Sequence, residues 1–315
     1  MKRARAKTAM LVVLLLWGLS VAWIPARAVG QCCGDCNGDG EVTVDELVTG
    51  VNRALTTCQD DGVCGVKKCN QDAVQVGNVC VDKYEASVWE IASSRADLIK
   101  AVQNGKIATP EDLSGATQRG HRFDNYGTGC PDTGNGCKDF YAVSIPDVIP
   151  SRWLTWFQAA AVCANAGKRL LTNQEWQVAA LGTPDPGSDN GTTDCNVATT
   201  TQRLPEDPVN TGSRRLCVSD RGAFDMVGNV DEWVADWSDH SNTIPEPGAK
   251  GCTNWPAAYG SDYSCVGGDG SVNVPGALFR GGGFYFGPGN GVFAVVAVDP
   301  SRTFSDGGFR CARQL

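Results

Sequence analysis

The segment Gly222–Trp237 contains the residues best suited to hold a metal. It has carboxylates at Asp225 and Glu232, and main-chain carbonyl groups at Gly228 and Val230 lie between them. Positions 228, 230 and 232 are two residues apart, so an extended chain would turn their groups to one side. A bend after position 228 would add Asp225. Oxygen ligands with two charges suit calcium rather than zinc or copper. The alternative is a solvated acidic turn anchored by core tryptophans, and the spacing does not decide between the two.

A second calcium loop is indicated at residues 35–46. The 12-residue pattern has glycine at its sixth position, where the loop turns sharply, and oxygen donors at the ligand positions. The expected ligands are Asp35, Asn37, Asp39, Glu41 (through its main chain), Thr43 and Glu46. An apolar stripe at helical spacing follows, from Val44 to Leu55. The pattern predicts one EF-hand or dockerin-type repeat within residues 29–57. A dockerin has two such repeats, so a cohesin-binding role and a calcium-stabilised spacer both remain open.

The first 28 residues have the features of a secretory signal peptide. Basic residues come first, an apolar run spans 9–23, and Ala26-Arg-Ala28 supplies small residues for cleavage. The run is short for a membrane span and no second one follows, so we expect no membrane association after removal. The segment contains five of the 27 basic residues and none of the 35 acidic ones, which leaves 22 basic residues and a net charge of −13. This balance argues against nucleic acid as a partner and favours a secreted protein, extracellular or periplasmic.

Cysteine usage points to the same compartment. All 15 cysteines follow the signal segment, a density typical of disulfides in exported proteins. Residues 58–74 are polar and cysteine-rich, and they predict a linker. Residues 75–315 are numerous enough for one domain with its own core. Within it, Cys130 and Cys137 flank a glycine-rich loop that they would close.

Regular secondary structure is expected to be sparse in this domain. Capping boxes, Thr155 with Gln158 and Thr172 with Glu175, predict helices near 156–166 and 173–182. Earlier helices are expected at 94–104 and from position 109 onward. After residue 181, Gly, Pro, Asn, Ser and Thr dominate, with short apolar runs such as 293–298. The pattern indicates an α+β fold of short strands joined by long loops.

Five motifs in order resemble the formylglycine-generating-enzyme, or sulfatase-modifying-factor, family. They are Cys80-Val-Asp-Lys-Tyr-Glu85, Gly167-Lys-Arg-Leu-Leu-Thr-Asn-Gln-Glu-Trp176, Gly222-Ala-Phe-Asp-Met-Val-Gly-Asn-Val-Asp-Glu-Trp-Val234, Phe279-Arg-Gly-Gly-Gly-Phe284 and Gly307-Gly-Phe-Arg-Cys-Ala312. The resemblance runs from about residue 75 to the C-terminus. It implies an elaborated C-type-lectin-like α+β fold with little regular structure, stapled by disulfides and calcium. It also implies that Asp225, Gly228, Val230 and Glu232 bind calcium. Only Asn196-Val197 resembles part of the family's second calcium site.

The resemblance also implies a disulfide between Cys163 and Cys311. We further expect Cys195 to pair with Cys217, Cys252 with Cys265, and Cys130 with Cys137.

The family oxidises a substrate cysteine to formylglycine with copper(I), which two thiolates bind after the Arg-Gly-Gly motif. Matching this chain to the motif places Phe286 and Gly291 at the thiol positions and Gly283 at a serine position. We therefore expect no copper and assign no catalytic residue. His121 and His240 lie in unrelated polar contexts and predict no metal site.

Two function classes follow from the sequence. The favoured one is a secreted, non-catalytic binding or scaffold module, whose ligand is an unknown peptide, protein or glycan. Its expected groove contains Arg280, Phe284, Tyr285 and Phe286. The alternative is an enzyme, either a formylglycine-generating oxidase that uses other cysteines or a divergent oxidase of the superfamily.

Overall fold

The structure, a computed structural model, describes residues 43–44, 68–198, 208–243, 249–269 and 274–315. The chain forms two compact units, Met1–Val66 and Lys67–Leu315. The expected signal segment and the expected calcium loop at 35–46, apart from Thr43 and Val44, lie outside the described residues. Within the described ranges, no helix is long and apolar enough to cross a bilayer. The fold that positions the candidate site is that of the second unit.

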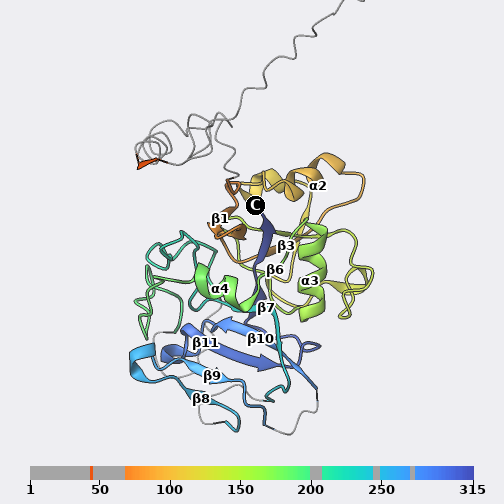
Figure 1. Ribbon diagram of the computed structural model, residues 1–315. Helices are drawn as coiled ribbons and strands as arrows, with labels where there is room; N and C mark the ends of the chain where they lie inside the picture. The colour runs from red at the N-terminus through yellow and green to blue at the C-terminus, as the bar shows by residue number, and fades with distance from the viewer. Residues whose placement is uncertain (1–42, 45–67, 199–207, 244–248, 270–273) are drawn as a thin grey trace, which may run out of the picture. The chain divides into compact units, whose positions relative to one another are not determined.

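Three β-sheets provide most of the regular structure of this unit (Figure 1). The largest has the order β12-β7-β10-β11-β9-β8, with β7 at Asp231–Ser238, β8 at Thr253–Asn254, β9 at Tyr263–Cys265, β10 at Gly276–Gly281, β11 at Gly291–Val298 and β12 at Gly307–Phe309. The second has the order β1-β2-β13-β6, with β1 at Ala73–Val76, β2 at Val79–Asp82, β6 at Arg169–Leu170 and β13 at Cys311–Gln314. The third has the order β4-β3-β5, with β3 at Ser87–Glu90, β4 at Thr117–Arg119 and β5 at Phe140–Val143.

The largest sheet contains the end of the segment Gly222–Trp237, in which the sequence predicts a calcium site. We call this segment the metal motif. β10 is buried along its whole length and pairs antiparallel with both β7 and β11. The Trp233 ring on β7 stacks on the Phe279 ring on β10, with 3.7 Å between their centroids. β12 pairs parallel with β7 and places Gly308 opposite Glu232. This register brings the C-terminal segment of the chain alongside the motif.

Three α-helices occur in the described part: α2 at Ala96–Gln103, α3 at Trp156–Asn165 and α4 at Asn173–Ala179. Both predicted capping boxes form, since Thr155 and Thr172 exchange side-chain and main-chain hydrogen bonds with the residues three positions later. α4 ends before the predicted position 182, where Gly182 takes a positive φ of 79°. The helix expected from position 109 is only a 3-10 turn, η1 at Pro110–Leu113. Further 3-10 turns are η2 at Gly127–Gly129, η3 at Ala257–Tyr259 and η4 at Gly287–Gly289.

Every cysteine within the described ranges belongs to a disulfide. The pairs are Cys69–Cys80, Cys130–Cys137, Cys163–Cys311, Cys195–Cys217 and Cys252–Cys265. Four of them are the pairs expected from the sequence, and the bridge from residue 69 to β2 was not foreseen. The bridge between α3 and β13 closes a separation of 148 residues, which contributes on the order of 4–5 kcal/mol in the chain-entropy model. Cysteines 32, 33, 36, 58 and 64 lie outside the described residues.

Candidate functional site

The metal motif forms a tight turn before β7 rather than the extended segment expected from its two-residue spacing. Asp225, Gly228 and Asn229 have φ values of 58°, 74° and 61°, all in the left-handed region. A Cβ at position 228 would collide with the main chain of Asn196, so only glycine fits there. The extended chain begins at Asp231. The spacing argument was therefore wrong for positions 228–230, while the expected bend at 228–229 is present.

A buried guanidinium holds the Glu232 carboxylate. Arg310 donates to Glu232 from Nη2 at 2.5 Å and from Nε at 2.7 Å, and both side chains are fully buried. Trp176 on α4 donates from Nε1 to the same carboxylate at 2.7 Å. Arg310 also donates to the main-chain oxygens of Asp82 at 3.1 Å and Phe224 at 2.8 Å. Arg310 thereby ties the metal motif, β2 and the C-terminal segment together.

Two further carboxyl groups adjoin this ion pair. Glu85 accepts hydrogen bonds from Asn229 Nδ2 at 2.5 Å and from the main-chain N of Val230 at 3.0 Å. Burial, with the charges of Asp225 and Glu232 adding to it, raises the pKa of Glu85 well above its usual range. Burial raises the pKa of Asp225 to about 7. Three buried carboxyl groups thus lie near the single positive charge of Arg310. The two carboxyl groups that it does not neutralise must hold protons or attract a cation.

The calcium ligands expected from the sequence are all oxygen donors. Asp225 and Glu232 would supply two carboxylates, and Gly228 and Val230 lie between them in the sequence. Among the described residues, no group of three or more His, Cys, Asp or Glu is arranged to hold a metal. The expected set has only two carboxylates and takes its other ligands from the main chain, as calcium sites commonly do. Calcium would have to share Glu232 with its guanidinium partner, Arg310.

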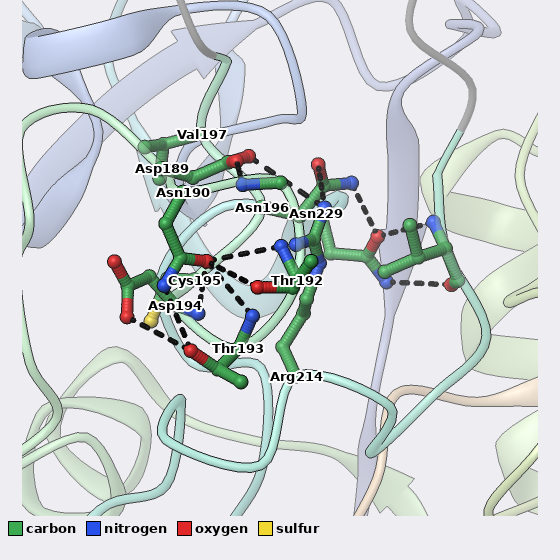
Figure 2. A network of polar contacts seen from close by, with 12 residues as sticks. Asp189, Asn190, Thr192, Thr193, Asp194, Cys195, Asn196, Val197, Arg214 and Asn229 are labelled. Carbon is green, nitrogen blue, oxygen red and sulfur yellow. Dashed lines mark hydrogen bonds and ion pairs between the residues drawn. The ribbon is translucent and has the colours of Figure 1, made fainter.

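An amide and ion-pair network joins Asn229 of the turn to Asn196 and Arg214 (Figure 2). Asn196 donates from Nδ2 to Asn229 Oδ1 at 3.0 Å, and its main-chain oxygen accepts from Asn229 N at 2.8 Å. Arg214 Nη2 lies 3.5 Å from Asn196 Oδ1 and 3.7 Å from Asp189 Oδ2. Asn190 Oδ1 accepts from three successive main-chain N–H groups, those of residues 192–194. At the segment that resembles part of a second calcium site, the structure thus places a guanidinium beside the amide oxygen.

The groove expected from the Arg280–Phe286 segment is only partly present. Arg280 is buried, lies over the Trp176 ring at 4.5 Å and donates to the main-chain oxygen of Ala294 at 2.6 Å. Phe284 is also buried. Both were wrongly assigned to a ligand-facing groove, because β10 and the turn after it direct these side chains into the core. Tyr285 and Phe286 remain half-buried at the surface.

Two of the three positions matched to the family's reactive residues, Gly283 and Gly291, adjoin acids. A Cβ on Gly291 would collide with the Asp262 carboxylate, which accepts from Phe293 N at 2.7 Å. Asp262 also shares a hydrogen bond with Asp185, and burial raises the pKa of Asp262 to about 7. Phe286 packs edge-on against Tyr263, with 5.9 Å between ring centroids. The space of one matched thiol is therefore filled by a carboxyl group.

The serine-matched position has an acid pair of its own. A Cβ on Gly283 would lie 3.1 Å from Asp306 Oδ2 and 3.4 Å from Asp231 Oδ2. The two carboxyl groups share a hydrogen bond, and burial followed by the Asp306 charge raises the pKa of Asp231 well above its usual range. A small pocket adjoins this pair. Its lining includes Asp231, Tyr263, Phe286 and the glycines at 282 and 289.

Sequence reasoning missed the partners that complete these clusters. They are Asp185, Asp262, Asp306 and, in their structural roles, Glu85 and Arg310. Glu85 and Arg310 lie within the family-like motifs, which was the only sequence signal for these two residues. No sequence spacing related the three aspartates to Gly283 or Gly291.

Comparison with known proteins assigns the domain. Residues 111–315 match the family described as the sulfatase-modifying factor enzyme 1-like domain. No curated protein matches the chain.

Among solved structures, the P3c variant of the Major Tropism Determinant is similar at 22% identity and a TM-score of 0.34, over 56% of this chain and 46% of that one. CarF is similar at 17% identity and a TM-score of 0.33, over 75% of this chain and 86% of that one. PvdO from Pseudomonas aeruginosa is similar at 21% identity and a TM-score of 0.27, over 53% of this chain and 62% of that one. The alignment spans about half the length of the first of these.

Proposed function

Because the chain belongs to the sulfatase-modifying factor enzyme 1-like family, we propose that it is a secreted calcium-binding protein whose domain is a non-catalytic binding or scaffold module. The ligand would be a peptide, protein or glycan. The observation that carries this proposal is the Asp262 carboxylate beside Gly291, in the space that a side chain at this position would need. The alternative is an oxidase of the formylglycine-generating type.

Copper(I) chemistry needs two soft thiolate ligands. The matched positions have a phenyl ring at Phe286 and no side chain at Gly291. The nearest cysteines in the chain, Cys265 and Cys311, are both in disulfides and have no thiolate to offer. A carboxylate at this place is a hard ligand and a poor substitute for sulfur.

A peptide-oxidation assay tests this part of the proposal. The full chain would be incubated with copper(I), oxygen and a Cys-x-Pro-x-Arg peptide, the motif that the family recognises. We expect the peptide thiol to persist by mass spectrometry. Conversion of the cysteine to an aldehyde would restore the oxidase, and a Cys→Ser peptide provides the blank.

Two calcium sites belong to the proposal. The excess of buried carboxyl groups over guanidinium around Asp225 supports the site with Gly228, Val230 and Glu232. The loop of residues 35–46 supports the other through its 12-residue ligand pattern. Calcium bound at residues 35–46 would hold that loop in one conformation. Calcium bound at Asp225 would neutralise buried carboxylate charge that protonation would otherwise have to neutralise.

Calorimetry on the full chain separates the two sites. We expect Asp225→Asn and Glu46→Gln each to remove one of two binding events and the double variant to remove both. Asp225→Asn preserves shape and lowers only the charge. No heat of calcium binding, together with a melting temperature unaffected by chelator, would contradict both sites.

The disulfides support the proposed location. Cross-links of this number persist in oxidising compartments, outside the cell or in the periplasm. The net charge of −8 disfavours nucleic acid as the ligand.

A further inference from the structure

An aromatic cluster lies at one edge of the largest sheet, next to the Asp185–Asp262 pair. β8, the 3-10 turn η3 and β9 form a hairpin at this edge (Figure 1). Trp255 and Tyr259 on the hairpin have their ring centroids 5.8 Å apart, and Phe293 on β11 lies 5.2 Å from the Tyr259 centroid. We call these three side chains the hairpin cluster. Trp255 is 39% exposed and Tyr259 is 45% exposed, so the folded chain leaves large parts of both rings in water.

The hairpin cluster is held rigidly. The Cys252–Cys265 disulfide closes the base of the hairpin. Trp255 N donates to the main-chain oxygen of Asp262 at 2.9 Å, and Asn254 Nδ2 donates to that of Ser261 at 3.0 Å. Exposed rings fixed in this way lose little conformational entropy when a ligand covers them. The rings of Trp255 and Tyr259 are therefore exposed on a fixed hairpin and not on a loosely held loop.

Hydrogen-bond acceptors border the rings. Asp262 Oδ2 accepts from the main-chain N of Phe293, a member of the cluster. A Cβ on Gly260, next to Tyr259, would collide with the carboxylates of both Asp185 and Asp262. The missing side chain at position 260 brings the acid pair to the edge of the rings. Asp262 itself is buried and Asp185 is exposed, so the surface joins an apolar face to the carboxyl group of Asp185.

We infer that the hairpin cluster is a glycan-binding surface that takes an uncharged pyranose unit of a polysaccharide. A pyranose ring has an apolar C–H face, which suits Trp255 and Tyr259, and hydroxyl groups at its rim, which suit Asp185. The exposed parts of the two rings amount to roughly 200 Å², far below the ~800 Å² per partner of a stable protein interface. The acid pair and the net charge of −8 repel anionic glycans. The proposal gives the binding module a ligand class, and in that respect it rests on the proposed function.

Native gel electrophoresis with uncharged polysaccharides in the gel tests the inference. The full chain would be run with hydroxyethylcellulose, galactomannan or dextran. We expect at least one of them to retard the protein, and Trp255→Ala to weaken that retardation roughly tenfold. Trp255→Phe keeps an aromatic ring and should keep part of the binding, which separates loss of contact from loss of folding.

The matched control is Trp237→Ala. Trp237 is 40% exposed on β7 and, like Trp255, contacts another ring, that of Trp156 at 5.1 Å, so it matches Trp255 in type and exposure. Its replacement should leave the retardation unchanged. Equal loss in both variants indicates nonspecific adsorption and overturns the inference, as does the absence of retardation in all three gels.

Two more outcomes count against the inference. Concentration-dependent self-association that disappears in Trp255→Ala would make the cluster a protein interface. Binding of cationic chitosan alone, lost in Asp185→Asn, would make it a cation site. The peptide-oxidation assay does not involve these rings, so a failure here with no aldehyde product leaves the proposed non-catalytic role standing.

Discussion

Two acid-rich regions of the domain compensate their buried charge in different ways. Around Glu232, a guanidinium from Arg310 meets the carboxylate directly and ties three chain segments together. Around Gly291, Asp262 and Asp185 face each other and share a hydrogen bond. The Arg310 guanidinium therefore compensates Glu232 in the first region, whereas the Asp262–Asp185 pair in the second depends on a proton. The family motif is retained where Arg310 meets the acids, whereas two of the three matched reactive positions, Gly283 and Gly291, have no side chain and adjoin a pair of acids.

Removing the guanidinium should have the largest effect. Arg310→Met leaves Glu232 buried beside Asp225 and Glu85 without its partner, which should lower the free energy of unfolding by about 3–5 kcal/mol. Thermal and urea denaturation would measure the loss. The control is Arg119→Met, which breaks an ion pair with Glu90 whose side chains are 31% and 38% exposed, and it should cost under about 1 kcal/mol. Similar losses in both variants would refute the contrast between the regions.

Adding one methyl group at the second region should have an intermediate effect. Gly291→Ala pushes a Cβ into the Asp262 carboxylate, which should lower the free energy of unfolding by about 1–3 kcal/mol. In the Asp262→Ala background the same change should cost almost nothing, because the colliding group is gone. Urea denaturation of the four proteins of this double-mutant cycle measures the coupling. Equal costs in both backgrounds would show that the acid does not fill the space.

The pH dependence isolates the contribution of a single proton. The pKa of Asp262 rises from 3.8 to about 7 on folding. Its proton therefore contributes stability that is present in full below pH 3.8 and is lost as the pH rises through 7. The melting temperature should fall between pH 5 and pH 8, and Asp262→Asn should reduce this slope.

Asp112 provides the control for this measurement. Main-chain hydrogen bonds from Ala108 and Thr109 lower its pKa, so its contribution is constant above pH 5. Asp112→Asn should shift the melting temperature equally at every pH in this range. If the pH slope of the melting temperature were unchanged in Asp262→Asn, the claim that a proton on Asp262 stabilises the region around Gly291 would be wrong.

Local signals in the sequence predicted local structure well. The capping boxes at Thr155 and Thr172 located α3 and α4, because the bonds that define them span only three residues. The apolar run at 293–298 lies within β11. The turn at Gly228 was expected, but the left-handed conformation of Asp225 and Asn229 was not, since no short pattern specifies it.

Contacts between distant segments were beyond the reach of these patterns. Arg310 and Glu232 are 78 residues apart, and Glu85 and Asn229 are 144 apart. The charges in the sequence did not indicate which of the many acidic residues would contact Arg310 or each other. Arg280 was assigned to the expected groove, yet the carbonyl oxygens of Val292 and Ala294 and the Trp176 ring surround it inside the domain. Such placements follow from strand register rather than from composition.

The Cys69–Cys80 bridge determines how the domain would carry mechanical load. Tension transmitted along the chain from before Lys68 enters through this bridge at β2, so it bypasses β1, the edge strand that would otherwise peel away first. From β2 the force passes across the ladder to β13, which the Cys163–Cys311 bridge fastens to α3. The two covalent links lie on either side of one strand pairing. Pulling on the N-terminal segment therefore loads that pairing in shear, the direction in which its hydrogen bonds resist together.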